Sequence, residues 1–159
     1  MKVPIYQCQL VRSAETAYDA RYRMNSTAAA IRLCEQLLEP ILYNAPQEQF
    51  LVITLDTKTK PTGVHPITQG TLDCSLVHPR EVFRVAFLAN ASTIILAHNH
   101  PSGDLEPSVQ DLEVTKRLAQ AGRLLGIEVH DHIIMAVNDK KQFRGLSLRE
   151  HDSSPWTSL

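Results

Sequence analysis

Apolar residues recur at helical spacing in three stretches, each of which begins with a residue suited to a helix start. Residues 25–42 begin with a capping signal and continue with apolar positions three and four apart, which predicts an amphipathic helix. Residues 79–90 begin with Pro79, which fits the first helical turn. Residues 108–125 begin with Ser108 and end before a glycine. We therefore expect three helices, each with one apolar face.

Runs of β-branched and other apolar residues predict strands between and after these helices. The first two runs flank a turn that contains proline and glycine, so we expect the two strands to pair as neighbours. The third run is apolar throughout, as in a fully buried strand, and the last two flank a polar turn. The predicted strands cover residues 50–56, 64–72, 93–97, 127–137 and 142–148.

The interleaving of strands and helices predicts a single α/β domain, with a mixed β-sheet flanked by helices. We place this domain at residues 25–150, because no long linker, repeat or low-complexity segment interrupts it. Residues 1–24 are assigned to an N-terminal extension, in which the alternation over residues 3–11 leaves room for a strand. Residues 151–159 form a tail that is polar except for Trp156, and we expect this tail to be frayed.

Composition narrows the classes of function. The chain of 159 residues carries 16 Lys and Arg against 17 Asp and Glu, so it lacks the basic excess that drives nonspecific binding to nucleic acids. Three widely spaced cysteines favour neither a disulfide framework nor a thiolate zinc site, and they fit a reducing cytoplasm. The apolar runs are shorter than the roughly 18–20 residues that cross a bilayer, so no membrane segment is expected.

Two histidines at the end of the third strand are candidate metal ligands. Because side chains alternate across a strand, His98 and His100 share one face and can reach one ion. Asp111, in the first turn of the next helix, is the best candidate for a third ligand. Two imidazoles and a carboxylate suit zinc and leave a fourth position for water, as in catalytic sites. The alternatives are structural: hydrogen-bonded core histidines, and a capping box in which Ser108 pairs with Asp111.

The same residues belong to a longer motif. It consists of His98-Asn99-His100-Pro101-Ser102-Gly103-Asp104, then Pro107-Ser108, then Asp111. This motif resembles the JAMM motif of MPN-type zinc metalloproteases, in the form found in RadC-type proteins. The resemblance runs from about Gln49 to Leu148 and includes residues 55–58, 70–72, 78–81 and 131–132. It implies a deaminase-like α/β fold with Zn²⁺ held by His98, His100 and Asp111 and a water completing the site.

The resemblance also implies roles for further residues. Ser108 matches the motif serine, which helps to stabilise the tetrahedral intermediate in active relatives. The family's general-base glutamate lies near the start of the first sheet strand, where this chain has Glu48; Glu81 is the main competitor, and either could instead be a solvated charge. His132 matches a family position and is interpreted as a structural histidine or a partner of a metal ligand. Cys74 is interpreted as a small buried residue, because no base is placed for a catalytic thiol.

Two functions are therefore carried forward. The first is a zinc-dependent hydrolase of peptide or isopeptide-like amide bonds, acting on a peptide or protein conjugate. The second is a DNA repair-associated accessory or interaction module without proteolytic activity, as RadC-type proteins were historically interpreted. Residues 1–24 carry four Lys or Arg and two Asp or Glu, and this weak positive bias does not by itself support a nucleic-acid partner.

Overall fold

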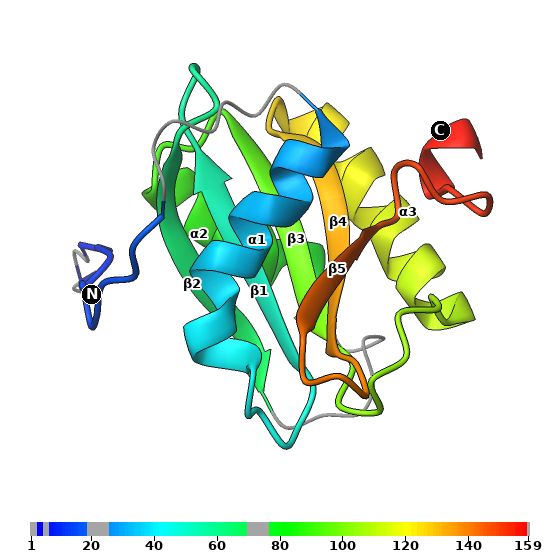
Figure 1. Cartoon of the computed structure of the whole chain (residues 1–159). Helices are drawn as coiled ribbons and strands as arrows, with labels where there is room; N and C mark the ends of the chain where they lie inside the picture. The colour runs from blue at the N-terminus through cyan, green and yellow to red at the C-terminus, as the bar shows by residue number, and fades with distance from the viewer. Residues whose placement is uncertain (1–2, 5–6, 19–25, 70–76, 159) are drawn as a thin grey trace.

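A mixed β-sheet forms the centre of the molecule (Figure 1). The computed structural model describes residues 3–4, 7–18, 26–69 and 77–158. Within these residues, five strands follow the order β2-β1-β3-β4-β5, with β3 and β4 parallel and every other neighbouring pair antiparallel. The strands are β1 (Gln49–Leu55), β2 (Pro61–Gln69), β3 (Thr93–Asn99), β4 (Glu128–Val137) and β5 (Phe143–Ser147).

Helices cover both faces of this sheet. In Figure 1, α1 (Thr27–Leu42) crosses the front face, and α2 (Pro79–Leu88) and α3 (Val109–Leu125) lie behind it. The sheet thus has two apolar layers. The α1-side core includes Leu33, Leu38, Ile53, Ile95, Ile133 and Met135. The α3-side core includes Phe50, Val82, Phe83, Leu96, Leu118 and Val129. This arrangement confirms the single α/β domain with helices on a mixed sheet.

The predicted helix ends match the structure closely, because local hydrogen bonds set them. Ser26 caps α1 by accepting a hydrogen bond from the Ala29 amide at 3.3 Å. Ser108 caps α3, and Gly126 ends it at φ 73°, a left-handed conformation that favours glycine. β3 continues two residues beyond the predicted end, so His98 lies inside the strand.

Two expectations for strands are wrong in detail. No strand occurs in the described residues 3–4 and 7–18, where Val3 and Val11 are 83% and 79% exposed. The described residues of this segment pair with neither edge strand, β2 nor β5, and the side chains of Val3 and Val11 stay exposed. β2 begins at Pro61, three residues earlier than predicted, because a proline is tolerated on an edge strand. The predicted residues 70–72 lie outside the described residues.

The C-terminal segment is ordered over its described residues, contrary to the expected fraying. Pro155–Ser158 form a short 3₁₀ helix, and Trp156 packs against the α3-side core. The Arg149 guanidinium lies 5.4 Å from the centre of the Trp156 ring. The sequence signal for this contact was the single tryptophan in a polar tail. No helix in the described part of the chain combines the length and apolar character needed to cross a membrane.

One irregularity in β4 decides which residues face the two cores. Ile94 pairs with Val129, whereas the next residue, Ile95, pairs with Asp131, so β4 holds one extra residue at His130. Residues four apart on a regular strand share a face. Because of the extra residue, Val129 faces the α3 side of the sheet, while Ile133 faces the α1 side. The bulge turns the His132 side chain toward α3.

Candidate metal centre

Strand β3 and the first turn of α3 bring the three predicted ligands together. His98 Nε2 lies 2.9 Å from His100 Nε2 and 3.1 Å from Asp111 Oδ1. His100 Nε2 lies 3.5 Å from Asp111 Oδ2. One ligand atom from each residue falls within 4.8 Å of the others. His98 and Asp111 are buried, and His100 is partly open to solvent, so the group has one accessible side.

The cap of α3 orients Asp111. The Ser108 amide and hydroxyl donate to Asp111 Oδ2 at 2.8 and 2.6 Å, and the Asp111 amide donates back to Ser108 Oγ at 3.1 Å. This is the capping box expected from the sequence. Because Oδ2 already accepts two hydrogen bonds, Oδ1 is the oxygen left to face His98.

Charges in this group are coupled. Burial alone would raise the pKa of Asp111, but the neighbouring imidazoles of His100 and His98 and the hydrogen bond from Ser108 outweigh burial and lower the pKa. Burial likewise opposes a charged His100, yet its contact with Asp111 and the Asp104 carbonyl raise its pKa, with a smaller contribution from Glu48. The Asp111 carboxyl is therefore ionised, which is the form that metal binding requires.

The loop after β3 fixes the ring of His100. His100 Nδ1 lies 2.7 Å from the Asp104 carbonyl oxygen. A carbonyl can only accept, so Nδ1 carries the proton and donates it. In the neutral ring Nε2 then keeps its lone pair, and it points toward His98 and Asp111. A backbone carbonyl on the distal nitrogen is the usual support for a metal-binding histidine.

The donor set fits zinc. In a tetrahedral site with Zn–N and Zn–O near 2.0–2.2 Å, ligand atoms lie roughly 3.3–3.5 Å apart. The Nε2 atoms of His98 and His100 are 2.9 Å apart and His98 Nε2 is 3.1 Å from Asp111 Oδ1, both close to this range, while the 3.5 Å contact of His100 is to the other carboxylate oxygen, Oδ2. Two imidazole nitrogens and a carboxylate oxygen converging at such distances call for a shared proton or a cation. The group could hold a metal ion, and imidazole with carboxylate donors suits zinc as well as other divalent first-row metals.

Glu48 lies at the same end of the sheet, half-buried and immediately before β1. Its carboxylate is close enough to contribute to the raised pKa of His100. Asn99, between the two histidines, holds this segment: its Oδ1 accepts from the Gln49 amide at 2.8 Å, and its Nδ2 donates to the Gln47 carbonyl at 3.2 Å. The backbone on both sides of Glu48 is thus tied to the strand that carries His98.

Glu81 has a different environment. It lies in the first turn of α2, where it pairs with Arg84 at 2.8 Å and Arg80 at 3.3 Å. These contacts match the structural alternative, a favourable charge at a helix N-terminus. Cys74 lies outside the described residues.

The resemblance suggests a structural histidine or a partner of a metal ligand at His132, and this ring lies directly beneath the group together with Thr115, which the sequence did not indicate. His132 Nε2 is 2.8 Å from His98 Nδ1, and His132 Nδ1 is 2.5 Å from Thr115 Oγ1. Phe50 packs against both imidazoles, stacked on His98 and edge-on to His132. The even spacing of His98 and His100 gave no signal for these partners, because they come from α3 and from the strand that contains the bulge.

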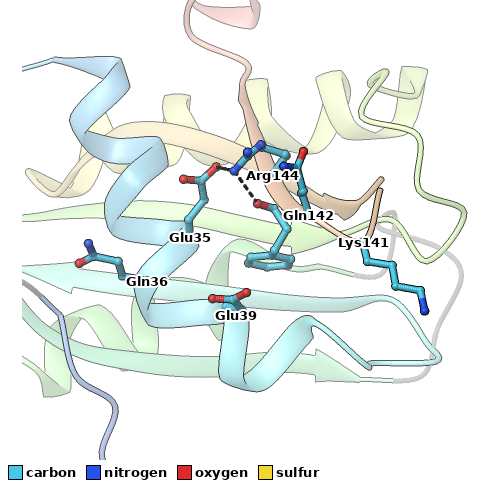
Figure 2. Close-up of a pocket in the computed structure, with 7 residues that line it drawn as sticks. Glu35, Gln36, Glu39, Lys141, Gln142 and Arg144 are labelled. Atoms are coloured by element: carbon cyan, nitrogen blue, oxygen red, sulfur yellow. Dashed lines mark hydrogen bonds and ion pairs between the residues drawn. The ribbon is translucent and has the colours of Figure 1, made fainter. Parts of the chain in front are cut away.

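A separate pocket lies on the opposite face of the sheet. It has a volume of about 390 Å³ and is lined by Glu35 and Glu39 of α1 and by residues of the β4–β5 connection and β5, including Lys141 and Arg144. Figure 2 shows Arg144 turned toward Glu35, at 4.0 Å. The pocket is lined by two acidic and two basic side chains, and none of its lining residues belongs to the His98 group.

Comparisons with known proteins agree with the geometry. The family of RadC-like JAB domains matches residues 24–152. UPF0758 protein STH371 of Symbiobacterium thermophilum is 45% identical over 129 residues, which cover 76% of this chain and 55% of the relative. UPF0758 protein TTE0897 of Caldanaerobacter subterraneus is 49% identical over 114 residues, covering 72% and 46%. The chain thus spans about half the length of these relatives. The matches confirm the RadC-type resemblance and agree with the observed fold.

Proposed function

Because this chain belongs to the family of RadC-like JAB domains, we propose that it is a zinc-dependent hydrolase of peptide or isopeptide-like amide bonds. The observation that carries the proposal is the convergence of His98, His100 and Asp111 within 4.8 Å at the carboxyl end of β3, the central strand of the sheet. The partly exposed side of His100 gives a substrate access, and the buried sides of His98 and Asp111 hold the ligands rigidly.

Zinc bound by these residues would polarise a carbonyl and activate water near neutral pH. Glu48 is the proposed general base: its carboxylate would accept the proton of the attacking water and return it to the leaving amine. The position of Glu48 supports this role, since the carboxylate already acts on His100 electrostatically and Asn99 holds its flanking backbone.

Ser108 is the proposed oxyanion donor. Its hydroxyl donates to Asp111 Oδ2 at 2.6 Å, while its amide donates to the same oxygen at 2.8 Å. The amide can keep Oδ2 satisfied if the hydroxyl turns toward a developing oxyanion. One residue can therefore cap α3 and stabilise a transition state.

The proposed substrate is a peptide or protein conjugate, met in the reducing cytoplasm. In the structure Cys8 and Cys34 are free cysteines, which is consistent with that compartment. Residues around the accessible side, such as Val109 at 68% exposure, would contact the acyl or amine portion. An exposed aliphatic side chain next to the oxyanion donor favours an apolar group in the substrate.

Metal content and isotope incorporation test the proposal. Purified protein should hold about one zinc per chain by plasma mass spectrometry, and His98→Ala and Asp111→Ala should lose it. A peptide and isopeptide library incubated in H₂¹⁸O should gain one ¹⁸O in each new carboxylate. Glu48→Gln should keep zinc and lose this incorporation, whereas the control Glu81→Gln should keep both.

Each arm has a result that contradicts the proposal. Unchanged metal content in the His98 and Asp111 variants would refute the proposed metal site. Full turnover in Glu48→Gln would refute Glu48 as the general base. Zinc binding without hydrolysis, joined to salt-dependent DNA binding in a gel-shift assay, would favour the accessory module instead.

A further inference from the structure

A buried chain of hydrogen bonds joins two of the candidate ligands from behind. It starts at the backbone carbonyl of Asp111, continues through the Thr115 hydroxyl at 2.5 Å and the His132 ring, and ends at His98 Nδ1. Thr115, His132 and His98 are each 0% exposed. Water therefore does not compete for these contacts, and the protons must be ordered within the chain itself.

The order of the protons follows from the first acceptor. The Asp111 carbonyl can only accept, so the Thr115 hydroxyl gives it its one proton. Thr115 Oγ1 must then accept from His132 Nδ1. Among the described residues, the side chain of His132 hydrogen-bonds only to His98 and Thr115, and a buried ring without a carboxylate partner is neutral. His132 Nε2 is therefore an acceptor, and His98 Nδ1 donates to it.

We infer that Thr115 is a positioning residue for the candidate metal centre: acting through His132, it fixes the proton of His98 on Nδ1 and leaves Nε2 to a metal ion. The inference rests on the proposed role of His98 as a ligand, and it does not depend on hydrolase activity.

His98 and His100 differ in the group that faces Nδ1, the nitrogen away from the candidate metal. His100 faces a carbonyl, which accepts in every state. His98 faces another imidazole, which can either accept or donate depending on its tautomer. A fixed acceptor at His132 Nδ1 decides between the two tautomers of His132, because it holds the proton on that nitrogen. Thr115 supplies that acceptor because its own proton is already committed to Asp111.

The fold holds this chain at both ends. Thr115 lies one helical turn after Asp111, so the residue that orders the protons and the carboxylate ligand sit on the same face of α3. The bulge at His130 turns His132 toward them, and Asp131 Oδ1 anchors the turn by accepting from the His132 amide at 2.7 Å. A ligand on β3 and a ligand on α3 are thereby linked through the core as well as through any bound metal.

Removing the hydroxyl of Thr115 should reverse the positions of the ring protons on His132 and His98. In Thr115→Val, which keeps the branched shape, His132 Nδ1–H would lose its acceptor. The tautomer with the proton on Nε2 then becomes the favoured state, because that proton can be donated to His98 Nδ1. His98 would have to carry its own proton on Nε2, the atom that faces Asp111 and His100. Thr115→Ser keeps the hydroxyl and is the matched control.

Long-range ¹⁵N–¹H NMR on metal-free protein reads the tautomer directly, because protonated and bare ring nitrogens have separate ¹⁵N shifts. His98 Nδ1 should be protonated in the unsubstituted protein and in Thr115→Ser, and bare in Thr115→Val. Competition with a fluorescent chelator should show zinc affinity reduced about 10–100-fold in Thr115→Val relative to Thr115→Ser.

A bare His98 Nδ1 in the unsubstituted protein would overturn the inference without any variant. Equal zinc affinities and unchanged ¹⁵N shifts in the two folded variants would also overturn it. Absence of zinc binding by the unsubstituted protein is a different result: it would refute the proposed function, while the metal-free NMR measurement would still report on the proton order.

Discussion

Replacing Asn99 by alanine should separate the candidate base from the candidate ligands. The Asn99 side chain is 3% exposed and bonds to the backbone before and after Glu48, at Gln47 and Gln49. In Asn99→Ala both bonds are lost, but His98 and His100 keep their own supports. We expect zinc binding to persist and hydrolysis to fall.

The magnitudes follow from those two hydrogen bonds. At about 1 kcal/mol each, their loss should lower the free energy of unfolding by about 2 kcal/mol. For a domain of this size that corresponds to about 4–8 °C in melting temperature. A displacement of Glu48 by about 1 Å should reduce turnover by about 10²-fold. Asn99→Asp keeps the bond to the Gln49 amide but sets a buried carboxylate oxygen against the Gln47 carbonyl, so it should lower stability at least as much as alanine does.

Thr54→Val is the matched control for stability. Thr54 is also fully buried on β1 and hydrogen-bonded, to Thr62 and His65, but it lies five residues from Gln49. At 3.3 Å per residue this places it about 17 Å along the strand. Melting curves, zinc competition and ¹⁸O incorporation would be compared between the two variants. Equal turnover in Asn99→Ala and Thr54→Val at matched stability would refute the positioning of Glu48 by Asn99.

Three further predictions concern the fold that supports the site. Burial raises the pKa of Asp131 to about 6, against hydrogen bonds from Ser147 and backbone amides. The native state then holds this proton more tightly than the unfolded chain, so the stabilising contribution is full below about pH 4 and is lost as pH rises through about 6. This contribution to the free energy of unfolding amounts to about 3 kcal/mol at most. Asp131→Asn should flatten the decline of stability with pH, measured by denaturant titrations at several pH values. A titration midpoint near pH 3.9 for the ¹³C shift of the Asp131 carboxyl would contradict the raised pKa. Gly122→Ala would place a Cβ 2.4 Å from the Ile127 carbonyl, so it should cost about 1–3 kcal/mol by denaturant unfolding, while Ala at exposed Gln120 changes stability by less than about 0.5 kcal/mol. Trp156→Ala should lower the melting temperature by several degrees, since about 1–2 kcal/mol of packing on the α3-side core is lost; an unchanged melting temperature would mean the C-terminal segment adds no stability.

The parts of the fold that depend on local contacts could be predicted from the sequence. The capping residues Ser26 and Ser108 and the terminal Gly126 marked the helix ends, because each acts on backbone groups within four residues. The spacing of His98 and His100 placed both on one strand face, and the first turn of α3 brought Asp111 to them.

The rest depends on pairings between distant residues. The role of Asn99 could not be predicted from its place between two histidines, since that role requires the pairing of β1 with β3. His132 carried no spacing to the site, because one extra residue in β4 decides the face on which it lies. The strand expected over residues 3–11 and absent from the described part of that segment has the same cause: alternation describes a strand that could form, but it does not specify a partner strand.

The unpaired residue at His130 also makes β4 tolerant of a change in length at this position. Deleting His130 would leave Ile94 opposite Val129 and Ile95 opposite Asp131, so Asp131 and His132 would keep their faces and the ladder would lose its bulge. Deleting a residue between Asp131 and Ile134 would instead turn part of the strand over, because the paired residues on one side of the deletion would move to the other face. Among descendants of such a chain, loss of a residue at His130 should therefore be retained more often than loss of a residue within the paired part of β4.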